Sequence, residues 1–138
     1  MPDIEDIKPV KVDPTLKQKI FVEDFDDTVV CFQIVFFGRQ WYCRISAQTS
    51  KLNNLHLSIP TPFDNVPSSI CILNGSSSAE SKSLSQRLAQ KLRCPVLVSV
   101  VLPNDQPMLK ALCERRLVQE LKLMQEQIQS EDLQQQKE

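Results

Sequence analysis

Few side chains in this sequence have a type and spacing that could do chemistry. His56 and Ser58 lie two positions apart and could act as a base and a nucleophile. Such a pair also needs an acid to orient the imidazole. Asp64 is the nearest acid in sequence, and it lies in a segment with three prolines between positions 60 and 67. We therefore expect His56 to have a structural role, not a catalytic one.

The cysteines are a second source of possible chemistry. Their number, five, is odd, and no two of them have C-x-x-C spacing. This argues against a zinc knuckle and against a disulfide framework. We expect mostly buried, reduced thiols that pack as small hydrophobic side chains. A thiol-dependent enzyme stays open as an alternative, and it would require a cysteine of low pKa. The cysteines are Cys31, Cys43, Cys71, Cys94 and Cys113.

The scarcity of two other residue types excludes further chemistry. The single histidine excludes multi-histidine metal sites. The two glycines are too few for a glycine-rich loop that holds phosphates. We therefore expect no catalytic residues, no metal and no cofactor.

Composition points to a soluble globular domain, and the charge pattern excludes some classes of partner. The chain has 138 residues, of which 41% are hydrophobic and 24% charged, which suits one domain. It has no apolar run of about 20 residues, so we expect no membrane span and a cytosolic location. A nuclear location in addition stays open. Residues 29–113 carry eight Lys and Arg against three acids, yet the net charge is −1. Nucleic-acid binding is not expected at this charge. A protein partner with an acidic surface remains compatible with it, as does simple solvation.

The apolar periodicity changes from strand-like to helical near residue 75. Ser77 and Glu80 form a capping box, which predicts a helix of about 15 residues that ends before Pro95. A second helix is predicted from about Met108 to Gln125. The predicted strands are 20–23, 28–37, 41–46, 55–59, 69–74 and 95–102.

This order predicts an α+β fold. We expect a mixed, mostly antiparallel sheet of about six strands with two helices packed on one face. The strands 69–74 and 95–102 are expected to form a parallel pair joined by a right-handed crossover. The predicted organisation is a flexible N-terminal arm (1–16), a single domain (17–124) and a frayed, Gln-rich tail (125–138).

Alternation along the strands divides the predicted sheet into two faces. One set is uniformly apolar and should lie under the helices: Val30, Phe32, Ile34, Phe36, Trp41, Cys43, Ile45, Leu55, Leu57, Ile59, Val96, Val98 and Val100. The other set mixes aromatic, charged, polar and aliphatic residues, which is typical of recognition surfaces. From it we predict a partner interface of Gln33, Val35, Tyr42, Arg44, His56, Leu97, Ser99 and Val101. A half-solvated face, or one covered by the N-terminal arm, is the alternative.

Three segments together resemble a known family. They are Ser83–Lys91, the strand Val96–Val100 and the helix around Leu112–Leu121. In these segments, and in the order of its elements, the chain resembles the proteasome assembly chaperone 4 family over roughly residues 18–122. The arm before Thr15 and the tail after Met124 have no counterpart in the resemblance.

The resemblance implies a non-catalytic chaperone. Members of this family pair with proteasome assembly chaperone 3, which has a similar fold. The heterodimer binds an α-type subunit of the 20S core and promotes α-ring formation. A homodimer in the absence of the companion stays open. The family has no short contact motif, so the mixed face is our own prediction for pairing, and Arg87 and Lys91 are our prediction for subunit docking. The alternative is a small adaptor or scaffold subunit of another cytosolic complex.

Overall fold

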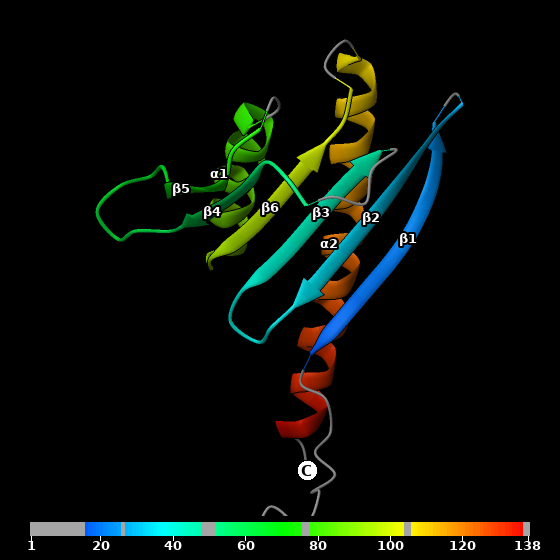
Figure 1. Ribbon diagram of the computed structural model, residues 1–138. Coiled ribbons are helices and arrows are strands. Elements are labelled where there is room, and N and C mark those ends of the chain that lie inside the picture. The colour runs from blue at the N-terminus through cyan, green and yellow to red at the C-terminus, as the bar shows by residue number, and fades with distance from the viewer. Residues whose placement is uncertain (1–15, 26, 48–51, 76–77, 104–105, 137–138) are drawn as a thin grey trace, which may run out of the picture.

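The computed structural model describes residues 16–25, 27–47, 52–75, 78–103 and 106–136. Within these residues the chain forms a sheet and two helices (Figure 1). The strands are β1 (Lys17–Phe25), β2 (Thr28–Phe36), β3 (Trp41–Ala47), β4 (Leu55–Ile59), β5 (Ser68–Leu73) and β6 (Val96–Val101). The helices are α1 (Ser78–Leu92) and α2 (Pro107–Gln136).

The sheet has the order β1-β2-β3-β6-β4-β5. β3 and β6 are parallel, and the other neighbours are antiparallel, so the predicted α+β fold class is confirmed. The segments 69–74 and 95–102 run parallel as predicted, because β4 is antiparallel to both, but their predicted direct pairing is wrong, because β4 lies between β5 and β6. β4 and β5 form a hairpin, which leaves the other edge of β4 to pair with β6.

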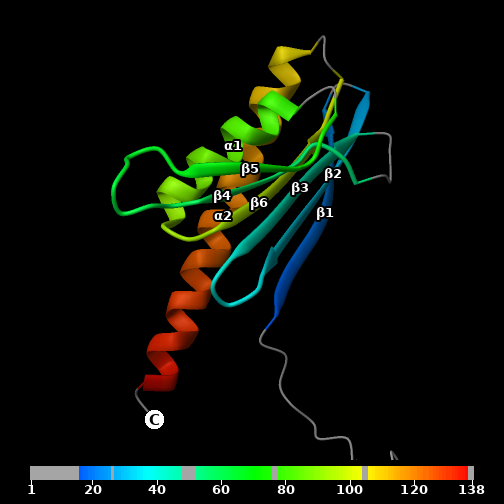
Figure 2. The same ribbon diagram turned by 60° about the vertical axis from the view of Figure 1, so that its left-hand side comes forward.

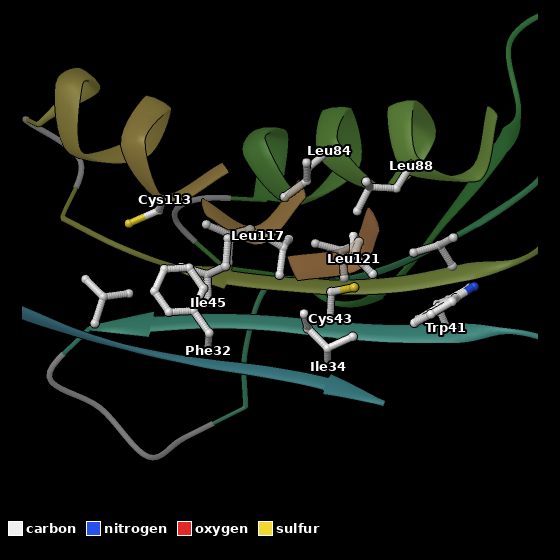
Figure 3. Close-up of a cluster of buried hydrophobic side chains, with 14 of the residues drawn as sticks. Phe32, Ile34, Trp41, Cys43, Ile45, Leu84, Leu88, Cys113, Leu117 and Leu121 are labelled. Atoms are coloured by element: carbon white, nitrogen blue, oxygen red, sulfur yellow. The ribbon is translucent and has the colours of Figure 1, made fainter. Parts of the chain in front are cut away.

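Both helices cover the same face of the sheet, as Figures 1 and 2 show. α1 packs over β4, β5 and β6, and α2 crosses β2. Apolar side chains from the sheet and from both helices fill the space between the two layers (Figure 3). The residues that meet there include Phe32, Ile45, Leu84, Leu88 and Leu117, all at most 2% exposed. Burying each such side chain stabilises the fold by about 1.5–3 kcal/mol.

α2 is longer than the sequence predicts. It continues past the predicted end at Gln125 as far as Gln136. Ile128 packs against the core, and Glu131 forms an ion pair with Lys17 of β1. These contacts connect the turns after Gln125 to the core and to β1.

β4 faces the opposite way from the prediction. Leu57 pairs with Leu97 of β6, which puts it on the side away from the helices. His56 pairs with Val98, and that residue belongs to the core under the helices. His56 and Ser58 therefore point toward the helices, and placing Leu55, Leu57 and Ile59 under the helices was wrong.

A hydrogen bond to α1 explains this orientation. The Oγ atoms of Ser58 and Ser85 lie 2.7 Å apart, and both residues are fully buried. Ser85 Oγ also donates to the carbonyl oxygen of Lys82 at 2.9 Å. A hydroxyl has one proton, so Ser58 donates to Ser85. Two small hydroxyls satisfy each other there and let α1 approach β4 closely.

This direction of donation predicts unequal effects of alanine substitution. Ser85→Ala leaves the buried Ser58 hydroxyl without an acceptor and should lower the free energy of unfolding by about 1–3 kcal/mol. Ser58→Ala should cost less, because Ser85 keeps its bond to Lys82. The double variant should match Ser58→Ala, as urea denaturation of the three variants can check. Equal and additive losses would contradict the assignment.

Candidate partner-binding surface

The sheet face opposite the helices is called the open face. No described helix lies on it (Figures 1 and 2). The registers place on it side chains from all six strands, listed here: Ile20, Val22, Cys31, Gln33, Val35, Tyr42, Arg44, Ser46, Leu55, Leu57, Ile59, Ile70, Leu97, Ser99 and Val101.

The centre of the open face carries polar side chains that are buried or half-buried. Ser99 is fully buried, and its Oγ donates to the carbonyl oxygen of Asn53. Tyr42 and Arg44 stand half-buried beside it. Partial burial raises the pKa of the Tyr42 phenol, and the charge of Arg44 opposes that effect. The phenol therefore keeps its proton at neutral pH and can donate a hydrogen bond to a partner.

Two apolar flanks border this centre. On one side, Ile20 and Val22 of β1 are 58% and 60% exposed. On the other side, Ile59 of β4 and Ile70 of β5 are 38% and 54% exposed. Clustered aliphatic side chains around a polar centre are typical of interaction sites, unlike single exposed hydrophobic residues.

The open face contains seven of the eight residues predicted as the partner interface: Gln33, Val35, Tyr42, Arg44, Leu97, Ser99 and Val101. The eighth, His56, was placed wrongly, since it is 5% exposed and lies on the helix side. The open face also includes Ile20 and Val22, which sequence reasoning did not assign to it. Ile20 and Val22 alternate with Phe21 and Glu23, and this alternation could have indicated that they share one face of a strand. β1 covers Lys17–Phe25 instead of the predicted 20–23.

The two predicted docking residues lie on the outer side of the helices. Arg87 and Lys91 line a groove of about 600 Å³ between α1 and α2, together with Arg115 and Lys122. Nη2 of Arg87 donates to both carboxylate oxygens of Glu114 on α2, at 2.9 and 3.0 Å. Part of the positive charge of Arg87 is thus already neutralised, whereas Lys91 is exposed at the groove.

The thiols give little support to nucleophilic chemistry. Burial raises the pKa of Cys113 to about 11, and it also raises the pKa values of Cys43 and Cys94. Those three thiols stay protonated at neutral pH. Cys31 and Cys71 are exposed, so the expectation of burial was wrong for them.

Two structural findings bear on metals and membranes. Among the described residues, no three His, Cys, Asp or Glu side chains come together closely enough to hold a metal ion. Neither helix in the described part of the chain carries the long apolar stretch that crossing a bilayer demands.

Comparison with known proteins gives one relative by sequence and one solved structure of similar fold. Human proteasome assembly chaperone 4 is 34% identical over 73 residues, which are 53% of this chain and 59% of the human protein. The match thus spans less than two thirds of that relative. A solved structure described as a novel chaperone complex for yeast 20S proteasome assembly is 13% identical, with a TM-score of 0.57. It covers 80% of this chain and 95% of the yeast chain, and shows a shared fold.

The family model described as proteasome assembly chaperone 4 matches residues 29–102. This range extends from β2 to the end of β6, so it includes most of the sheet and all of α1. It covers more than half of the chain, and this chain therefore belongs to the proteasome assembly chaperone 4 family.

Proposed function

We propose that this chain is a non-catalytic assembly chaperone of the 20S proteasome. It pairs through the open face with a structurally similar companion of the proteasome assembly chaperone 3 type, and the heterodimer binds an α-type subunit to promote α-ring formation. It acts in the cytosol and nucleus without a cofactor. The observation that carries this proposal is the open face, whose apolar flanks no described helix covers.

Stacking against a second sheet suits the open face. Two sheets pack about 10 Å apart and bury the side chains between them. The flanks around Ile20 and Ile70 would supply apolar area, and Tyr42 and Arg44 would set which partner fits. Without its companion, the same face can pair with a second copy as a homodimer.

Co-expression with a companion and with each α-type subunit tests this function. Size-exclusion chromatography should show a heterodimer, and one α-type subunit should join it in a ternary complex. A chain that pairs with neither and co-purifies with another cytosolic assembly would be an adaptor, which would overturn the proposal.

We further propose that the groove between α1 and α2 contributes to docking of the α-type subunit, through Lys91 and Arg87. Reversing both charges, Arg87→Glu with Lys91→Glu, should weaken subunit binding about tenfold, since each rim charge contributes up to about 1 kcal/mol. The heterodimer should be unaffected. Binding titrations at low and high salt measure both effects.

Arg87→Glu would also face Glu114, so a control must separate lost docking from a disturbed helix pair. Glu114→Gln removes the same ion pair and leaves Arg87 positive. It should bind the subunit at least as well as the unmodified chain. An equal loss in Glu114→Gln and in the charge reversal would argue against docking at this groove.

A further inference from the structure

The two edges of the sheet differ in chemistry. β1 at one edge carries Lys17, Lys19 and Glu23, and ion pairs with α2 engage all three. β5 at the other edge, Ser68–Leu73, has no charged residue. Charges on an edge strand discourage pairing with other chains. Only the β1 edge has this protection.

β5 has the properties of a strand that accepts another strand. In the sheet order it has β4 as its only neighbour among the described strands, so the backbone groups on its outer side have no strand to bond. Ile70, Ile72 and Leu73 are 54%, 48% and 39% exposed. A row of unpaired N–H and C=O groups is matched by another extended chain, and alternating apolar side chains add specificity.

The loop that precedes β5 presents an aromatic anchor beside this edge. Phe63 is 97% exposed, and the loop extends beyond the body of the molecule (Figure 1). The backbone N–H of Val66 donates to Asp64 Oδ1, and Gln86 Nε2 of α1 donates to the carbonyl oxygen of Pro67. Three prolines restrict the same loop. An aromatic side chain held out on a restrained loop loses little entropy when it enters a pocket.

We propose that β5 takes up an extended segment of the α-type subunit as a seventh strand, and that Phe63 enters an apolar pocket of the same subunit. The inference rests on the proposed function and adds the surface of this chain to which the α-type subunit binds. Hydrogen-bonding groups of an edge lie in the plane of the sheet, so the edge stays accessible when a companion covers the open face. The segment has apolar residues at alternate positions, and neither proline nor clustered charge.

Amide hydrogen exchange of β5 tests the position of the added strand. The outward-facing amides should exchange at least tenfold more slowly in the ternary complex than in the heterodimer, and the inward-facing ones should change little. Equal rates in both would overturn the proposal. Protection already present in the free chain or in the heterodimer would also overturn it, because another segment, a second copy or the companion would then occupy the edge.

Two substitutions test the contact without touching the open face. Cys71 is exposed and pairs with His56, which puts its side chain on the helix side of β5. Cys71→Lys adds a charge to the edge, and Phe63→Ser removes the anchor. Each should weaken α-type subunit binding at least tenfold and leave the heterodimer unchanged.

The matched controls are Gln129→Lys and Met108→Ser, which make the same kinds of change at exposed positions of α2. Both should bind like the unmodified chain. If the unmodified heterodimer binds an α-type subunit and both test variants bind it equally well, the inference falls and the proposed function stands. If the unmodified heterodimer binds no α-type subunit, both fall together.

Discussion

Replacing Leu97 and Ile20 with aspartate should weaken pairing with the companion at least 100-fold. Both side chains lie on the open face, Leu97 half-buried on β6 and Ile20 58% exposed on β1. In the free chain each carboxylate reaches water, so the fold should survive. In the heterodimer each carboxylate would be buried without a partner, which costs more than the roughly 1–3 kcal/mol of a neutral polar group. At about 2 kcal/mol each, the two costs together exceed the roughly 2.7 kcal/mol that corresponds to 100-fold.

Matched substitutions elsewhere separate this effect from a general loss of apolar surface. Met108 and Leu123 of α2 are 76% and 50% exposed and do not lie on the sheet. Met108→Asp with Leu123→Asp should pair with the companion as tightly as the unmodified chain. Analytical ultracentrifugation of each mixture gives both dissociation constants. Full pairing by Leu97→Asp with Ile20→Asp would place the companion on another surface.

Glu120 should contribute strongly to the stability of the isolated chain. Its buried carboxylate accepts hydrogen bonds from Lys19 of β1 and from Arg116, which also donates to Glu23 at 3.0 Å. These contacts tie the edge strand to α2. Glu120→Ala should lower the free energy of unfolding by about 1–2 kcal/mol, since Lys19 loses its acceptor and Arg116 keeps only Glu23. Glu126→Ala, at an exposed position of the same helix, should change it by less than about 0.5 kcal/mol.

The pKa of Glu120 leads to a prediction of how the free energy of unfolding depends on pH. The hydrogen bond from Lys19, followed by that from Arg116, lowers the pKa of Glu120 in spite of its burial. At low pH the unfolded chain therefore binds the proton more readily than the folded one. The stabilisation is complete above about pH 4.3, the usual glutamate value, and is lost as pH falls through the folded-state value. Urea denaturation from pH 7 to pH 3 should show this decline, and Glu120→Ala should flatten it. The same slope in both proteins would assign the acid response to other carboxylates.

Three of the strands show how far alternation alone can predict a face. In β2, β3 and β6 the apolar set of alternate residues lies under the helices as predicted, with Val30, Cys43 and Val98 fully buried. In each of these strands the other set of alternate residues includes a polar residue such as Gln33 or Arg44, so the two faces differ clearly in sequence. Because of this contrast, seven of the eight residues predicted for the partner interface lie on the open face, and their contact with a partner stays a prediction.

β4 shows where alternation misleads. Its leucines look like core residues, yet pairing with β6 puts Leu57 on the open face and Ser58 under α1. The deciding partner, Ser85, lies 27 positions away on another element. No pattern within five residues of a strand can report such a contact. The misplacement of His56 has the same cause.

The sequence by itself determined the order and approximate positions of the strands and helices, the α+β class and the absence of a motif for catalysis, because side-chain periodicity and residue type are local properties. Only the tertiary structure decided that β4 separates β5 from β6, that α2 continues to Gln136, and which edge of the sheet lacks charge. The physical reason is that strands pair through backbone N–H and C=O groups, which are the same in nearly every residue, so pairing depends little on residue type. The neighbours of each strand, and the face on which its side chains lie, are therefore decided by packing among elements that are distant in sequence.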